Sequence, residues 1–352
     1  MADRRNIIFE AARLHFEEGL KQDDVARRLK VSRPTAARYL AMARDMGYVH
    51  VRVLDPKGHA YLHDLEVALL ERFPSLQEVI LTSSRPEAQA TGPALAPAAR
   101  RAVADELAER AAGCVDQLLT TRRRQHPPVV AVARGEMIDN VISRIRPSRP
   151  VPELEVLPML GYLRTREYSY DANRLAQELA RIYAGNYEWI PAPAVVTHEE
   201  GAVLAAMPLV AAPLRKLCEE VNIVLTSVSC PFLTLPDGRR ELREQTLLQS
   251  GRVAREALLQ MVEEEGVVGE ICGWYYSRDR LVHAPGVEML GLAPERQQEL
   301  AADRERSVIG VAGGDPDRFE AIRAAVELGL INVLVTDYLT AHRLLERGEA
   351  ES

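Results

Sequence analysis

Basic side chains gather in one short stretch of the chain. The segment DDVARRLKVSRPTAARYL, residues 23–40, carries Arg33 and Arg38, and over residues 26–52 seven Lys or Arg side chains stand against one acid, Asp45. A guanidinium donates paired hydrogen bonds to guanine or to phosphate, and neighbouring hydroxyls also reach phosphate oxygens. The chemistry that this stretch favours is contact with a nucleic acid. The alternative is a solvated basic face on a helix that only packs.

The spacing of apolar residues predicts the helices that would present these arginines. We expect helices over about residues 5–20, 22–30 and 33–46. In the third helix Ala36, Leu40 and Ala43 share one face, which leaves Arg38 on the opposite side. A turn of three to four residues joins the second helix to the third, and this is helix-turn-helix spacing.

The third helix begins with a proline. Ser32 is the predicted N-cap, so Pro34 is the second helical residue, where its missing N–H costs little. After Gly47 the residues YVHVRV alternate as a strand does, and the turn Asp55–Gly58 would close a short wing. The N-terminal unit is therefore predicted to be a winged helix-turn-helix that binds double-stranded DNA.

A further helix connects this unit to the rest of the chain. Its segment, at about residues 60–72, carries leucines that approximate a heptad stripe, which suits either helix pairing between subunits or packing on its own domain. His59 and His63 stand four residues apart without a third ligand nearby, so we expect no metal. The predicted domains are 1–57 for DNA binding, 58–77 as a linker helix with a possible dimer contact, and 78–352 as a second domain.

From about residue 78 strands and helices alternate. Continuous apolar runs such as EVIL, PVVAV, NIVL, SVIGV and INVLV each lead to a loop and a helix. Such runs are typical of buried parallel strands, so a doubly wound α/β domain is predicted. Ligands of this fold bind where the strands end. Gly313 and Gly314 lie at such a point, where exposed amides and a helix N-terminus would hold a phosphate.

Composition narrows the class of protein. The chain has 352 residues, 47% of them apolar, and its formal net charge of −7 conceals the local basic stretch. It has no run of about 18 apolar residues and no N-terminal signal peptide, so we expect a cytoplasmic protein without a membrane partner. Four widely spaced cysteines are expected to be reduced thiols.

The N-terminal segment AARLHFEEGLKQDDVARRLKVSRPTAARYLAMARDMGYVHVRVLDP resembles the DNA-binding domain of the SorC family of bacterial transcriptional regulators. The residues that match the family pattern are Ala12, Arg13, Leu14, Gly19, Gln22, Ala26, Leu29, Ser32, Arg33, Arg38, Leu40, Ala43, Gly47 and Val49. The resemblance continues through EGVVGEICGWYYSRD and through IGVAGGDPDRFEAIRAAVELGLINVLVTDYLTAHRLL. It therefore covers almost the whole chain.

The resemblance implies an effector domain with a fold similar to phosphosugar isomerases, which binds a sugar phosphate or a related carbohydrate. It also implies a homodimer or homotetramer without a cofactor. The DNA-binding residues expected from the basic face and the resemblance are Gln22, Ser32, Arg33, Pro34, Thr35, Ala37 and Arg38. The expected effector-binding residues are Arg134, Gly135, Glu136, Asn173, Glu270, Gly313, Gly314, Arg318 and Asp337.

Two departures from the family pattern bear on these sites. Ala36 and Ala37 stand where the family has Val-Ser, which removes a hydroxyl from the third helix, so we expect a different base preference. In the loop ARGEM, Glu136 would repel a phosphate and Arg134 would partly compensate. A less anionic effector is therefore an open alternative.

Three functions fit these features. The first is a DNA-binding regulator, not an enzyme, in which a metabolite bound by one domain changes the placement of the other. The second is a sugar-phosphate isomerase with an appended DNA-binding domain, against which stands the lack of a recognisable catalytic motif in the sequence. The third is a DNA binder that responds to no effector.

Overall fold

The computed structural model describes residues 2–45, 56–83, 97–120, 126–163, 170–235, 238–243 and 245–346. These residues form two compact units, one that reaches to His59 and one that starts at Ala60. Each unit has a hydrophobic core of its own. All four cysteines are free, as predicted. No single helix in the described ranges is long and apolar enough to cross a bilayer, although one bent pair of helices passes the test by length and composition.

The N-terminal unit is helical. Its elements are α1 (Ala2–Ala12), the π-helical turn η1 (Arg13–Glu17), α2 (Gln22–Arg28) and α3 (Arg33–Asp45). Leu14, Val25, Ala36 and Leu40 are buried together between the helices, and this is the apolar face that the sequence predicts for α3. The residues expected to form the wing, 46–55, lie outside the described residues.

Helix α4 (Pro56–Arg72) begins earlier than expected. Residues 56–58 belong to it and do not form the predicted turn, because a proline fits the first helical position well. Leu65, Leu69 and Phe73 are buried in the core of the second unit. The leucine stripe therefore packs on its own domain, which is one of the two alternatives left open by the sequence.

The second unit is built on a parallel sheet with the strand order β1-β14-β13-β6-β2-β3-β4. Its strands are β1 (Glu78–Thr82), β2 (Val129–Val132), β3 (Glu155–Pro158), β4 (Asn186–Tyr187), β6 (Ile223–Ser227), β13 (Ser307–Val311) and β14 (Val333–Asp337). Every residue of β2, β13 and β14 is buried, since helices cover both faces of the sheet. The predicted α/β fold is confirmed.

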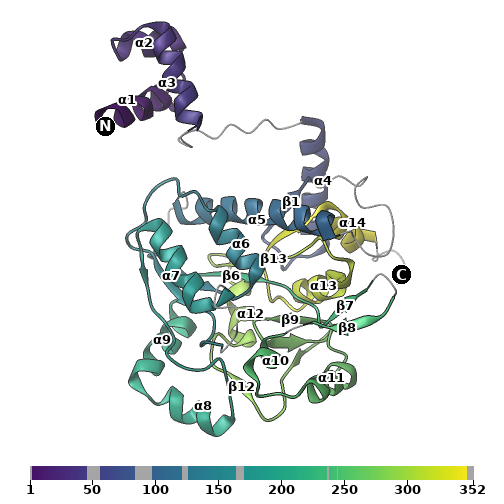
Figure 1. Ribbon diagram of the computed structural model, residues 1–352. Coiled ribbons are helices and arrows are strands. Elements are labelled where there is room, and N and C mark those ends of the chain that lie inside the picture. The colour runs from purple at the N-terminus through teal and green to yellow at the C-terminus, as the bar shows by residue number, and fades with distance from the viewer. Residues whose placement is uncertain are drawn as a thin grey trace. The chain divides into compact units, whose positions relative to one another are not determined.

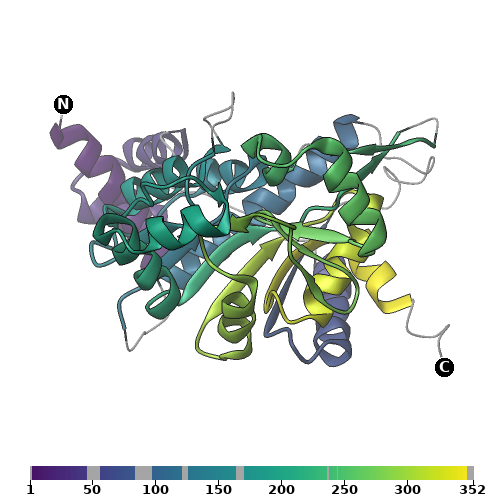
Figure 2. The same cartoon turned by 90° about the horizontal axis from the view of Figure 1, so that it is seen from below.

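The helices that precede or follow the strands in the chain lie on opposite faces of this sheet (Figure 1). They are α5 (Pro97–Thr120), α6 (Glu136–Arg144), α7 (Ala172–Tyr183), α12 (Pro294–Ala302), α13 (Phe319–Glu327) and α14 (Tyr338–Glu346). Figure 2 shows α5 on one face and α12 on the other. The chain winds outward from β2 in one direction and from β6 in the other. The boundary between β2 and β6 is therefore the topological switch point, where open α/β sheets bind ligands.

Short elements around the sheet were not predicted. They are β5 (Val195–Val196), α8 (His198–Ala205), α9 (Pro208–Glu219), β7 (Phe232–Thr234), β8 (Arg240–Leu242), α10 (Thr246–Ser250), α11 (Arg255–Glu264), β9 (Gly269–Ile271), β10 (Trp274–Tyr276), β11 (Leu281–Val282) and β12 (Glu288–Met289). An antiparallel bridge joins Ser229, just after β6, to Glu270 of β9. This bridge places β9 next to the carboxyl end of the central strand.

Candidate functional site

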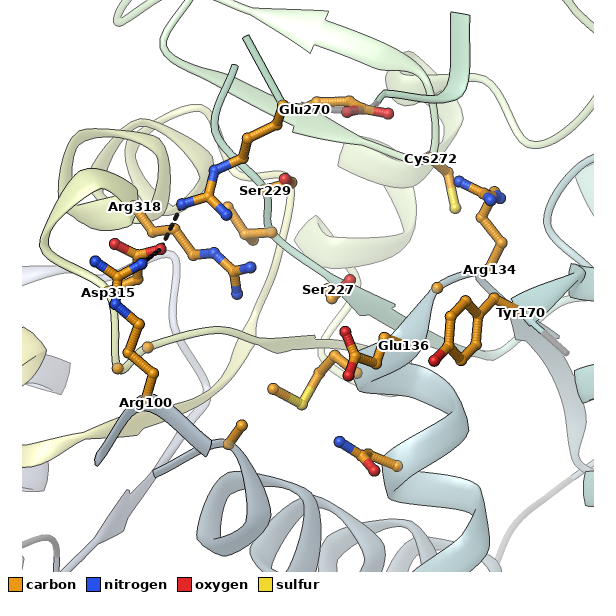
Figure 3. A pocket seen from close by; sticks show the side chains of 18 of the residues that line it. Arg100, Arg134, Glu136, Tyr170, Ser227, Ser229, Glu270, Cys272, Asp315 and Arg318 are labelled. Atoms are coloured by element: carbon orange, nitrogen blue, oxygen red, sulfur yellow. Dashed lines mark hydrogen bonds and ion pairs between the residues drawn. The ribbon is translucent and has the colours of Figure 1, made fainter. Parts of the chain in front are cut away.

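A cavity of about 840 Å³ opens at the switch point of the sheet. The loops that follow β2, β6 and β13 line it, together with α5, the start of α6 and the segment from Arg243 to Cys272. Figure 3 shows Arg100, Arg318 and Asp315 on one side of this cavity, and Arg134, Glu136, Tyr170 and Cys272 on the other. The two sides differ in charge, and we call the first the arginine side and the second the mixed side.

The arginine side is built around one carboxylate. Arg243 donates a hydrogen bond to Asp315, and a terminal nitrogen of Arg100 lies 3.8 Å from the same carboxylate. Asp315 also caps the 3₁₀ turn η4 (Pro316–Arg318), where it accepts a bond from the Asp317 amide at 3.2 Å. Although burial alone would raise the pKa of Asp315, the guanidiniums of Arg243, Arg318 and Arg100 hold it below its ordinary value.

Arg318 lies near Asp315 but makes no ion pair with any residue that the structure describes. It ends η4, and its Nε is buried with no hydrogen-bond partner among the described residues. Burial lowers the pKa of Arg318, and the neighbouring Arg243 and Arg100 lower it further, yet a guanidinium remains a cation at neutral pH. A half-buried cation next to two others is a site that an anion would stabilise.

The mixed side also includes Glu270 and Gln245, two buried residues that line the cavity, and the charge of Arg134 acts on Glu270. The Oε1 of Glu270 accepts bonds from the Thr246 hydroxyl and the Gly273 amide, both at 2.8 Å. Burial raises the pKa of Glu270, while the Thr246 bond and the charge of Arg134 oppose the rise. Gln245 accepts a bond from the Tyr275 hydroxyl at 2.6 Å. This side offers carboxylate and amide groups to the hydroxyls of a polar ligand.

Unsatisfied polar atoms gather on the wall of the cavity. Within the described parts of the chain, four buried side-chain atoms without a hydrogen-bond partner belong to cavity-lining residues: Arg134 Nε, Arg318 Nε, Gln245 Nε2 and Gln249 Oε1. Buried polar atoms normally have partners, so such a group needs an explanation. A polar ligand that supplies the missing partners is the simplest one.

Most of the expected effector-binding residues meet at this cavity. Those that line it are Arg134, Gly135, Glu136, Glu270, Gly313, Gly314 and Arg318. Two do not. The Asn173 side chain accepts a bond from the Ile190 amide at 3.0 Å, and Asp337 accepts bonds from the Gly314 amide and the Thr340 hydroxyl, both at 2.7 Å. Because these side chains bind protein groups, they hold the surrounding loops and do not face the cavity.

The glycine loop is held differently from the expectation. The sequence predicts free amides at Gly313 and Gly314, but Asp337 at the end of the neighbouring strand already accepts the Gly314 N–H. A Cβ on Gly313 would lie 2.3 Å from the same Asp337 carboxylate, so the close approach requires glycine. The cations beside the loop, and not the Gly314 amide, are therefore the groups available to an anion.

Sequence reasoning missed the other cavity residues that matter most. Arg100, Arg243, Gln245 and Asp315 were not singled out. Asp315 directly follows the glycine pair, so its position was a usable signal. Arg243 lies 72 residues before Asp315 in the chain, and nothing local in its sequence indicates the pairing.

The second candidate site is the exposed side of α3. Ser32, Arg33, Pro34 and Arg38 are exposed, and Arg38 makes no ion pair within the described residues. The Ser32 hydroxyl accepts a bond from the Thr35 amide at 3.3 Å, so it caps α3 as predicted. The remaining expected residues, Gln22, Thr35 and Ala37, are half-buried.

One acid lies closer to this face than the sequence suggests. Asp23, at the start of α2, lies 3.3 Å from the Nε of Arg33. Both side chains are more than half exposed, so the ion pair is weak and a phosphate can replace it. Arg38 is therefore the more available of the two predicted DNA-contacting arginines.

Known proteins resemble this chain over both of its units. Residues 60–346 match the family described as "Putative sugar-binding domain". The Deoxyribonucleoside regulator of Bacillus subtilis is 22% identical over 97% of this chain and 98% of its own length. The Uncharacterized transcriptional regulator YjhU of Escherichia coli is 25% identical over 96% of this chain and 94% of its own. The match thus extends from the effector unit across the helical unit.

Solved structures show the same fold. The crystal structure of the full-length Sorbitol Operon Regulator SorC from Klebsiella pneumoniae superposes with a TM-score of 0.69 and 20% identity, over 97% of this chain and 98% of that one. A DeoR family transcriptional regulator from Listeria monocytogenes gives a TM-score of 0.61 over 80% of this chain and 98% of that one, at 20% identity. The α/β unit thus belongs to the family described as "Putative sugar-binding domain". The chain belongs to the SorC family of transcriptional regulators, as the resemblance predicted.

Proposed function

We propose that this protein binds operator DNA through α3 and a phosphorylated sugar, or a related anionic carbohydrate, in the cavity of its α/β unit. The observation that carries the effector proposal is the arginine side, where Arg318 has a buried unpartnered Nε next to Arg243 and Arg100. A phosphoryl group would bring negative charge to these guanidiniums and an acceptor oxygen to the Nε of Arg318. The mixed side then faces the hydroxyls of the ligand.

The effector proposal is tested by thermal unfolding of the full-length protein with matched pairs of sugars and sugar phosphates. A ligand that binds only the folded state raises the melting temperature by mass action. We expect at least one phosphorylated sugar to raise it, and its unphosphorylated counterpart to do so much less. Equal shifts within each pair would contradict a phosphoryl site and favour the less anionic effector.

The DNA proposal rests on Arg38, which is exposed and makes no ion pair with the described part of the chain, and on the capped start of α3. We propose that the protein acts as a homodimer or homotetramer, because one helix-turn-helix reads one half-site of a palindrome. We also propose that it acts in the cytoplasm, where the DNA is. Binding to such a duplex should weaken steeply with salt as counterions are released. Light scattering gives the oligomeric state, and a monomer on DNA would contradict this part.

Enzymatic turnover is the competing function, since Glu270 is a buried carboxyl whose raised pKa would suit an acid or a base. We propose binding without turnover, because one oxygen of Glu270 is already held by Thr246 and Gly273. Incubation of sugar phosphates with the protein, followed by NMR, tests this. Formation of an isomerised product at a rate that depends on Glu270 would overturn it.

A further inference from the structure

We propose that Asp315 sets the charge selectivity of the cavity, so that the arginine side accepts a single phosphoryl group and discriminates against anions of higher charge. The proposal rests on the proposed function, because it assumes that the ligand's anionic group lies on the arginine side. It goes further by naming the residue that decides how much negative charge this side accepts.

The position of Asp315 is the first part of the argument. Its side chain is only 8% exposed, and it lies between the side chains of Arg243 and Arg100, which are 19% and 26% exposed. The same carboxylate caps η4, the turn that ends at Arg318. Asp315 is therefore a fixed negative charge in direct contact with the group of cations that would hold the ligand.

No other acid in the described segments has this position. Asp317 is close in sequence, but its two oxygens accept bonds from the Thr234 amide at 2.6 Å and the Thr234 hydroxyl at 2.7 Å, and it does not line the cavity. Asp105 lines the cavity but pairs with Arg144, at 2.5 Å. Among the described residues, Asp315 is the cavity-lining acid that contacts the arginine side directly.

The size of the cavity does not provide this selectivity. About 840 Å³ is ample for a small sugar that carries one or two phosphoryl groups. The net charge of the site then decides between ligands with one and with two phosphoryl groups, because interactions between charges are strong where water is partly excluded. A monophosphate dianion is balanced by the cations that remain after Asp315 is subtracted, and a further negative charge meets the carboxylate itself.

The test is isothermal titration of the full-length protein with inorganic phosphate and with pyrophosphate, in low-salt buffer at about pH 8, where a phosphomonoester is a dianion. The variant Asp315→Asn keeps an oxygen that can cap η4 and removes the charge. We expect it to bind both anions more tightly and to raise the ratio of pyrophosphate to phosphate affinity about tenfold. Asp315→Glu, which keeps the charge, should preserve the wild-type ratio.

Asp105→Asn is the matched control. It removes a carboxylate that lines the same cavity but pairs with Arg144 instead of the arginine side, and should leave the ratio within about twofold. If Asp315→Asn leaves the ratio unchanged, or if Asp105→Asn changes it equally, Asp315 does not set the selectivity. If the wild-type protein binds neither anion, the proposed phosphoryl site itself is wrong.

Thermal unfolding separates this role from a purely structural one. Without a bound anion, Asp315→Asn leaves three guanidiniums adjacent and should lower the melting temperature, and phosphate should restore it. A purely structural cap would give a loss that phosphate does not restore, and that result would also overturn the proposal.

Discussion

Arg38 on α3 and Arg318 beside the cavity are the same side chain in two environments. Arg38 is exposed and surrounded by water, whereas Arg318 is half-buried and has cations as neighbours. The charge of Arg38 is screened and its desolvation is deferred until DNA binds. Arg318 is already largely desolvated in the folded protein, before any anion binds. Exposure thus suits an arginine for a salt-sensitive contact with a long polyanion, and burial suits it for selecting one small anion.

The largest effect that follows from this difference is at Arg318. Arg318→Ala should weaken the binding of phosphate or of a sugar phosphate on the order of 100-fold, because it removes a desolvated partner of the anion. Calorimetric titration measures this loss. The variant should unfold at no lower temperature than the wild type without ligand, since it relieves repulsion with Arg243 and Arg100.

The control for this variant is Arg101→Ala. Arg101 lines the same cavity but is exposed, so its removal should weaken binding by less than about threefold. Equal losses from the two variants would show that burial does not distinguish the cavity arginines, and the comparison with Arg38 would lose its basis.

A smaller effect is expected at Arg38. Arg38→Ala should cost about 1–3 kcal/mol in binding to the specific operator and much less in binding to unrelated DNA. The reason is that a guanidinium at a base edge carries sequence information, while one at a phosphate does not. Fluorescence anisotropy with the two duplexes at several salt concentrations measures both losses.

Arg27→Ala is the companion variant. Arg27 is exposed on α2, where it pairs with Asp24, and its loss should leave the ratio of specific to unrelated binding unchanged. If Arg38→Ala also leaves that ratio unchanged, α3 does not present Arg38 to the bases.

The two arginines also differ in how far the sequence predicts their surroundings. The face of α3 follows from residues within one helix, since Ala36, Leu40 and Ala43 bury one side and leave Arg38 on the other. The long parallel strands were predicted for a similar reason: each is a continuous apolar run. Local patterns are sufficient where neighbours in the chain are neighbours in space.

The cavity depends on contacts that no local pattern reveals. Arg243 meets Asp315 across 72 residues, and Asp337 reaches back 23 residues to the Gly314 amide. Strands such as β9 and β11 have two or three residues, too few to show a period. The glycine loop and Arg318 were found from the sequence, but the charge that faces them was not.

The Ser32 cap at the start of α3 gives a prediction for the stability of the helical unit. Ser32→Ala removes the acceptor for the Thr35 amide and should destabilise the helical unit by about 1 kcal/mol. Amide hydrogen exchange in residues 33–45 measures the loss, and the cavity unit should be unaffected. Ser32→Asn, which retains an acceptor, should restore protection, and equal exchange in both variants would exclude a capping role.

The smallest effects are expected on the pH dependence of stability, first at Glu270. Burial raises its folded pKa above the unfolded value of about 4.3, so its contribution to stability is complete below that value and is lost as pH rises through the folded pKa. Glu270→Gln removes this titration. The variant should gain stability relative to the wild type as pH rises from about 4.3 towards neutrality, measured by urea unfolding at several pH values.

Glu178 on α7 should show the opposite dependence of stability on pH. The hydrogen bond from Arg181 lowers the pKa of Glu178, so this group stabilises the fold above its unfolded pKa and loses that contribution as pH falls through the folded one. Glu178→Gln should therefore lose stability relative to the wild type at neutral pH and approach it in acid. If both glutamine variants changed with pH in the same direction, burial would not control the charge of Glu270, and the mixed side would offer the ligand an ordinary solvated carboxylate.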